Sequence, residues 1–137
     1  MCNLFFKMKE KEFTGYKIVV KKENGRYYSP AIGIEYTEGM TMPCINRKNA
    51  LFGFFKNNFK SPMEILTGTT YRSDMQGRTS VFVHKDEAHL FYYYIVRHDN
   101  SDNHIIVKMT ISEDLMDGEY HNFEVVAGRR IEKIEEL

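Results

Sequence analysis

Apolar and polar positions near the start of the chain predict a β-hairpin. Lys17-Ile18-Val19-Val20 is largely β-branched, and apolar residues resume at Tyr27 after Glu23-Asn24-Gly25-Arg26. Asn-Gly between two such runs is the favoured two-residue turn, because both turn positions need positive φ. We therefore predict strands near 15–22 and 27–36, joined at Asn24-Gly25.

The second of these strands has two unlike faces at a period of two residues. One face is bulky and apolar, and the other is small and polar, with Ser29 on it; the bulky face holds Tyr28, Pro30, Ile32, Ile34 and Tyr36. Pro30 cannot donate a ladder hydrogen bond, so the strand is predicted to be an edge there or to carry a bulge. The small face is expected to meet solvent or a ligand.

Residues 43–78 form the least regular stretch. Leu51, Phe55 and Phe59 recur at helical spacing, which predicts a short helix over 47–59. Residues 67–78 are mostly Thr, Gly, Ser, Asp, Gln and Arg, a composition typical of a loop. A loop of this length inside a domain is usually functional or disordered.

Regular patterns return in the second half of the chain. Residues 79–83 predict a short strand, and a helix near 86–98 follows, with Asp86 as its N-cap. Its apolar stripe comprises Ala88, Phe91, Tyr92 and Ile95.

The last third alternates between strand and turn signals. Residues 105–111 alternate as a half-buried strand does, 112–120 read as an acidic loop or a turn at Asp117-Gly118, and 123–127 predict another strand. Ile131 and Ile134 are expected to anchor a charged tail.

Together these elements predict one α+β domain over 1–137, with a mostly antiparallel sheet, an N-terminal hairpin and one main helix near 86–98. Residues 1–12 are expected to be a loosely ordered N-terminal segment. Hydrophobic residues make up 42% of the 137 and charged residues 28%, which suits a folded soluble domain. Cys2 and Cys44 read as free thiols, and with no signal peptide or membrane span in the pattern the chain is predicted to be cytoplasmic with no membrane partner.

The formal net charge is zero, but its distribution is uneven. Residues 43–85 carry seven Lys or Arg against two Asp or Glu, and residues 86–137 carry five against twelve. Arginine and aromatic residues alternate in the basic segment, as they do in sites for phosphates and stacked bases. The pattern predicts that a ligand of this chain would be a small anion at the loop 67–78 and the start of the helix. The candidate ligand-binding residues are Ser29, Arg72, Arg78, His84 and Lys85.

Chemistry-bearing motifs do not stand out elsewhere. His84 and His89 are five residues apart without further ligands at zinc spacing, so no metal is expected. No nucleophile elbow, P-loop or dinucleotide fingerprint occurs, and we predict no catalytic residue and no cofactor. Tyr92-Tyr93-Tyr94 covers three sides of a helix, so one ring should face the core while others are partly exposed and favour self-association.

Two family resemblances can be stated. The layout of Tyr16-Lys17-Ile18-Val19, Gly25-Arg26-Tyr27-Tyr28-Ser29, Tyr36-Thr37-Glu38-Gly39 and Val81 to Ala88 resembles small uncharacterised proteins of phages and bacterial mobile elements. That resemblance implies a small accessory protein. The passage from Arg78-Thr79-Ser80-Val81 to Ala88 resembles ADP-ribosyltransferase-like folds, whose late E-x-E motif has here its only counterpart at Glu10-Lys11-Glu12.

The sequence thus favours a binding or protein-interaction domain, more readily non-enzymatic than enzymatic, that self-associates through exposed aromatic residues. One alternative is a nucleotide-directed transferase or hydrolase of the ADP-ribosyltransferase-like type. The other is a nucleic-acid-binding module that uses the basic segment 43–85, although nucleic acid is the less expected partner.

Overall fold

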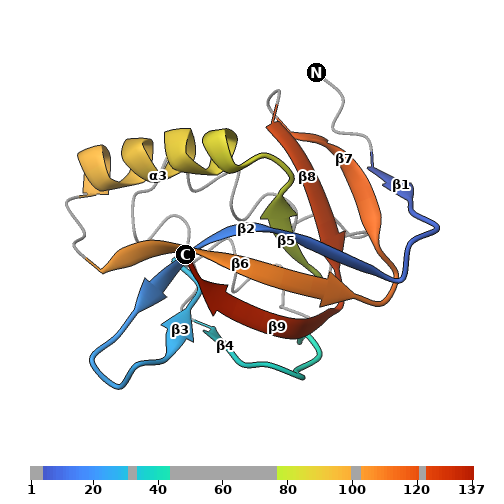
Figure 1. The fold of residues 1–137 in the computed structure, drawn as a ribbon, viewed down its shortest axis with the longest axis horizontal. Coiled ribbons are helices and arrows are strands. Elements are labelled where there is room, and N and C mark those ends of the chain that lie inside the picture. The colour runs from blue at the N-terminus through green and yellow to red at the C-terminus, as the bar shows by residue number, and fades with distance from the viewer. Residues whose placement is uncertain (1–4, 31–33, 44–76, 100–102, 121–122) are drawn as a thin grey trace.

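Strands dominate the structure, a computed structural model that describes residues 5–30, 34–43, 77–99, 103–120 and 123–137. Within these residues one helix accompanies a nine-stranded sheet (Figure 1). The elements are β1 (Phe5–Lys7), β2 (Glu12–Lys21), β3 (Tyr27–Tyr28), β4 (Glu35–Tyr36), β5 (Thr79–Phe82), α3 (Lys85–Asp99), β6 (His104–Ser112), β7 (Met116–Tyr120), β8 (Phe123–Gly128) and β9 (Arg130–Glu136). The predicted α+β class with a mostly antiparallel sheet is confirmed.

Strand β2 organises the sheet. It pairs antiparallel with β6 from Glu12↔Ser112 to Val20↔His104, and β6 in turn pairs with β9. Its other edge pairs with β5 and, further along, with β3, which gives the order β1-β7-β8-β5-β2-β3-β4. The contact with β5 is close at Gly15, where a Cβ atom would lie 2.5 Å from the carbonyl oxygen of Phe82. A residue without a side chain is therefore needed at this crossing.

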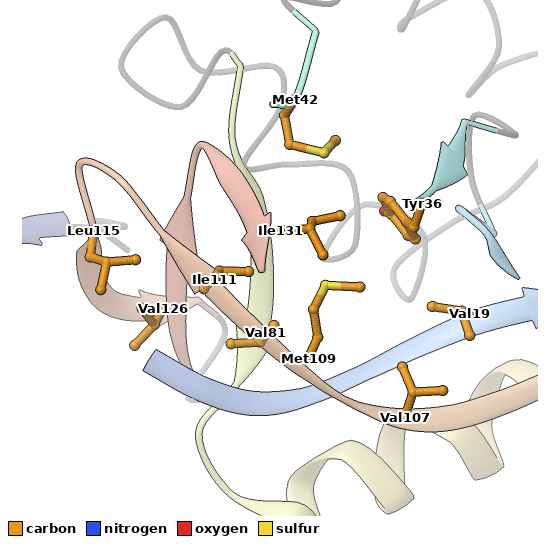
Figure 2. Close-up of a cluster of buried hydrophobic side chains, with 10 residues drawn as sticks. All are labelled: Val19, Tyr36, Met42, Val81, Val107, Met109, Ile111, Leu115, Val126 and Ile131. Carbon is orange, nitrogen blue, oxygen red and sulfur yellow. The ribbon is translucent and has the colours of Figure 1, made fainter. Parts of the chain in front are cut away.

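Both faces of the central strands are buried. Helix α3 covers one face, over a cluster that includes Ile18, Phe82 and Ile106. The other face forms a second cluster enclosed by β4, β9 and the segment 40–42 (Figure 2), made of Val19, Tyr36, Met42, Val81, Val107, Met109, Ile111, Leu115, Val126 and Ile131. In Figure 1, α3 lies along one side of the sheet, while β3, β4 and β9 lie along the other.

The turn after β2 differs from the predicted two-residue turn. The N–H of Gly25 donates to the carbonyl of Lys22 over 2.9 Å, and the N–H of Lys22 donates to the carbonyl of Arg26 over 3.0 Å. The loop therefore has three residues, and Gly25 alone takes a positive φ, of 78°. The Asn24 carboxamide accepts the N–H of Arg26, which holds Asn24 in a turn conformation that needs no positive φ. Strands β2 and β3 pair over two residues only.

The predicted continuous strand over 27–36 is wrong. Strands β3 and β4 pair with each other antiparallel, Tyr27 opposite Tyr36, so the chain reverses within this range. The N–H of Ser29 donates to the carbonyl of Ile34 over 2.7 Å, just before Pro30, which has no N–H to continue a ladder. The predicted division of residues 27–36 into a bulky face and a small face is therefore also wrong, because it assumed a single strand.

The acidic stretch after β6 is also different from its prediction. Asp117-Gly118 is not a turn, because both residues lie in β7, which pairs with β8 on one edge and with β1 on the other. The chain turns earlier, at Glu113 and Asp114, whose φ values are 65° and 52°. The backbone N–H and C=O groups of β7 pair with strands on both edges, so its acidic side chains do not prevent strand formation.

The two ends of the chain take part in the sheet. Phe5–Lys7, within the segment expected to be loosely ordered, forms β1. Ile131 is fully buried as predicted, but the charged tail around it is strand β9, which pairs with β6 through an irregularity between Thr110 and Ile111. The short strand and helix predicted after Arg78 are confirmed as β5 and α3, as are the strands β6 and β8. The predicted helix 47–59, and the loop 67–78 up to residue 76, lie outside the described residues.

Candidate functional site

Helix α3 follows β5 after only two residues, Val83 and His84. The N–H of Ala88 donates to the carbonyl of His84 over 3.1 Å, so His84 caps the helix and the predicted N-cap, Asp86, lies instead in its first turn. Asp86 and Glu87 still suit that turn, because the N-terminal end of a helix carries a partial positive charge.

The inner face of α3 is fixed by aromatic packing. Ala88 is fully buried and Phe91 is 4% exposed. The Phe91 ring centroid lies 5.4 Å from that of Phe82 on β5 and 5.0 Å from that of Phe123 on β8, the latter pair at 84°. Edge-to-face pairs of this kind contribute roughly 0.5–1.5 kcal/mol each beyond the area they bury. This packing sets the rotation of the helix about its axis.

The outer face of α3 carries two large apolar side chains in solvent. Leu90 is 60% exposed and Tyr93 is 63% exposed. They are three residues apart and therefore neighbours on the helix surface. The expectation for the tyrosine run is confirmed for two of its rings, since Tyr92 packs partly against the core while Tyr93 does not. We define the outer stripe as the exposed side chains of Asp86, Leu90 and Tyr93, which lie on one side of the helix.

Polar contacts tie the start of α3 to β8. The carboxylate of Glu87 accepts the backbone N–H of Glu124 over 3.1 Å, and the Nε2 atom of His84 lies 3.4 Å from Oε1 of Glu124. His84 is half exposed and the neighbouring Lys85 is exposed. These contacts account for His84 as a structural residue at the helix start.

The predicted ligand-binding residues do not converge. His84 and Lys85 follow β5, whereas Arg78 precedes it, so a four-residue strand about 13 Å long separates them. Arg78 is buried, and its Nε–H donates to the carbonyl of Asp114 over 3.1 Å. Ser29 is buried beyond the end of β3. Arg72 lies outside the described residues.

Sequence reasoning missed a polar cluster around the turn at Glu113 and Asp114. The Asp114 carboxylate accepts a hydrogen bond from Arg129 over 3.0 Å, and its carbonyl accepts the one from Arg78. Nearby, the Glu132 carboxylate accepts hydrogen bonds from Ser112 over 2.6 Å and from Arg130 over 3.0 Å. The Ser112 hydroxyl is the main reason that the pKa of Glu132 is below its usual value.

Ser112 lies on β6, and Arg130 and Glu132 lie on β9. The other partners lie in the connections between strands: Arg78, Asp114 and Arg129. Most of these residues are far apart in the sequence, so no local spacing predicts the cluster. Its arginine side chains already bond to carboxylate or carbonyl oxygens of the same domain. The cluster therefore holds strand ends together and offers no open group of cations to an anion. Within the described ranges, no group of three or more His, Cys, Asp or Glu residues is placed to hold a metal ion.

Comparison with protein-family models, with curated proteins and with solved structures finds no match for the chain. In the part of the chain that the structure describes, no helix is long and apolar enough to cross a bilayer. Among the described residues, Phe6 and Leu137 are also large, exposed apolar residues, but Leu90 and Tyr93 lie side by side on one helix.

Proposed function

We propose that the chain is a non-enzymatic protein-interaction domain and that the outer stripe of α3 is its contact surface. The observation that carries this proposal is the exposure of Leu90 and Tyr93 side by side on a helix whose opposite face is rigidly packed. Tyrosine is enriched at protein interfaces because it offers a large, stiff ring with a polar tip. The resemblance to small accessory proteins is in keeping with such a role.

The blocked edge of β9 supports the choice of the helix over this edge of the sheet. The N–H and carbonyl of Ile131 bond to Met40 and Gly39, and the Glu38 carboxylate accepts the N–H of Ile134 over 2.9 Å. An edge whose backbone groups are already paired cannot add a strand from a partner. A partner is therefore expected to bind to the exposed side chains of α3 rather than to the edge of β9.

No specific observation in the described residues supports either of the two alternative functions, the nucleotide-directed enzyme or the nucleic-acid-binding module. The nucleotide-directed enzyme depends on the resemblance of the passage from Arg78 to Ala88 to ADP-ribosyltransferase-like folds. The nucleic-acid-binding module depends on the basic segment 43–85, of which residues 44–76 lie outside the described ranges. Arg78, which the structure does describe in this segment, is buried with its Nε–H bonded to the Asp114 carbonyl.

A photo-crosslinking experiment tests the proposal. A benzophenone amino acid replaces Tyr93 in one variant and Lys133 in a matched control, since Lys133 is exposed on β9, on the other side of the sheet from α3 (Figure 1). Irradiation of cells that express each variant is expected to give discrete protein adducts, with a second copy or with another protein, at position 93 and not at position 133. Equal adduct patterns at the two positions, or no adduct at either, would show that α3 is not a contact surface.

A further inference from the structure

Lys17 is a buried cation in the middle of the sheet. It lies on β2 directly opposite Val107 of β6, and residues that face each other across an antiparallel pair project to the same side of the sheet. Val107 and the next alternate residue of β2, Val19, both belong to the apolar cluster on the face away from α3. The Lys17 side chain therefore enters that cluster, and the residue is only 4% exposed.

The described residues give the Lys17 ammonium no carboxylate partner. The ion pairs in this part of the chain join other side chains, and the more exposed Lys21 and Lys133 have carboxylate oxygens 2.6 Å and 2.7 Å from their Nζ atoms. Lys17 instead meets the ring of Tyr36, whose centroid lies 5.8 Å from Nζ, close to the outer limit of about 6 Å for a cation–π contact. A ring face attracts the charge but does not satisfy the three N–H donors of an ammonium.

A second hydrogen-bond donor lies beside this ammonium. Tyr36 is 6% exposed, and its hydroxyl makes no hydrogen bond to any side chain or backbone group of the described ranges. Charged groups inside proteins are usually paired, because an ion loses its hydration there and a contact with a ring restores little of it. The arrangement of Lys17 and Tyr36 thus favours an acceptor of negative charge between β2 and β4.

We propose that Lys17 binds the carboxylate of a small apolar molecule, with the Tyr36 hydroxyl as a second donor to the same group. One ammonium balances the single charge of a carboxylate, whereas a phosphate carries more charge and is better matched by several cations or backbone N–H groups. The surrounding cluster is apolar, which favours an aliphatic or aromatic body over a sugar. Met42 and Met109 belong to the same cluster, and their flexible side chains are able to repack around a bound molecule.

This site is separate from the contact surface proposed above. Lys17 faces the cluster enclosed by β4 and β9, while the outer stripe lies on α3 on the other side of the sheet (Figure 1). A small anionic ligand was expected at the start of α3, where the candidate residues do not converge. The buried lysine moves that expectation to the opposite face of the sheet.

Isothermal titration calorimetry of the full chain with octanoate tests the proposal. Octanoate is expected to bind at least about ten times more tightly than acetate, which lacks the apolar body, or octanamide, which lacks the charge. Lys17→Met keeps the length of the side chain and removes its charge, so it is expected to weaken octanoate binding about tenfold or more. Lys21→Met is the matched control on the same strand, where the lysine already pairs with Glu136, and it is expected to leave the Kd unchanged.

An NMR titration of the unmodified chain gives a readout that needs no variant. Octanoate is expected to shift the backbone amide signals of Lys17, Tyr36 and Val107 more than octanamide does. Lys17→Met is expected to fold with a thermal midpoint at least as high as that of the unmodified chain, because an apolar side chain replaces a buried charge. If that variant does not fold, the NMR titration decides alone.

Three results would overturn the proposal: no binding of octanoate, equal binding by Lys17→Met and the unmodified chain, or amide shifts centred on Leu90 and Tyr93 instead of Lys17. None of them bears on the contact surface of α3, which is tested by the crosslinking at position 93. The two proposals therefore fail separately.

Discussion

The crossing of β2 and β5 makes a strong prediction at Gly15. A Cβ atom at this position would lie 2.5 Å from the Phe82 carbonyl oxygen, 2.5 Å from Cγ2 of Val81 and 2.9 Å from Cβ of Val81. Real Cβ atoms do not approach other atoms so closely, and the carbonyl belongs to a backbone held by the pairing of Tyr16 with Phe82. Gly15→Ala therefore cannot be accommodated by the rotation of a side chain.

The expected cost follows from overpacking. Adding a methylene to a filled core costs about 1–3 kcal/mol, and a clash with backbone belongs at the upper end. The substitution also lowers the conformational entropy of the unfolded chain, which offsets about 0.4–1 kcal/mol of the loss in stability. We expect a net loss of about 2 kcal/mol in the free energy of unfolding, equivalent to roughly 8 °C in Tm for a domain of this size.

Urea denaturation of Gly15→Ala measures this loss, with Gly25→Ala as the matched control. Gly25 has open space around it and a φ of 78°, so its substitution costs only the strain of a left-handed alanine, about 1 kcal/mol. In a double variant, Val81→Ala relieves part of the clash that Gly15→Ala creates. The double variant should therefore lose less free energy of unfolding than the two single variants lose in sum. If Gly15→Ala proves as stable as the unmodified chain, or if the two losses simply add, the close crossing of β2 and β5 is wrong.

Three further predictions follow from the helix and the turn. Phe91→Ala is expected to lower the free energy of unfolding by about 3–5 kcal/mol, while Tyr93→Ala stays within about 0.5 kcal/mol; similar losses in chemical denaturation would contradict the two-faced helix. Ser112→Ala is expected to raise the pKa of Glu132 in an NMR titration. Because the folded-state pKa of Glu132 is lowered, its stabilising contribution is present above the unfolded value of about 4.3 and is lost as the pH falls through the folded value; an unchanged pKa in the variant would remove Ser112 as the cause. Glu113→Gly is expected to raise the thermal midpoint through a gain of up to about 1 kcal/mol, since it relieves the left-handed φ; a lower midpoint would mean that the side chain has a structural role.

Elements with a strong local period were predictable from the sequence. The alternation through Ile105, Val107 and Met109 predicts β6, and Ala88 with Phe91 predicts the buried face of α3. These patterns reveal themselves within a few residues, because side chains in a strand or helix repeat at a fixed spacing.

Elements defined by distant backbone partners were not predictable. Strand β7 has an acidic, glycine-containing sequence typical of a turn, and it exists because β1 and β8 lie on either edge of it. The role of Gly15 depends on Val81 and Phe82, which are more than sixty residues away along the chain. The reversal between β3 and β4 has a local cue in Pro30, yet the apolar period through that stretch favours a straight strand.

The candidate site was predictable in part. The tyrosine run indicates that a ring must reach solvent, and Tyr93 does so. Leu90 escapes the same reasoning, because an exposed leucine is common and gains meaning only beside Tyr93 on a helix whose rotation is known. Arg78 and Ser29, attractive as ligand residues by type, are buried within the domain instead.

Under the proposed function, the two faces of α3 separate stability from recognition. The inner face supplies core contacts to Phe82 and Phe123 through Phe91, and the exposed Leu90 and Tyr93 lie on a different side of the helix. Leu90 and Tyr93 are mostly exposed, so the proposed partner can constrain them without affecting the core. A helix arranged in this way allows contact residues to change without unfolding the domain, and it predicts that substitutions at Leu90 and Tyr93 alter association while the free energy of unfolding of the monomer stays the same. That separation is the property by which a contact surface differs from a patch of badly packed core.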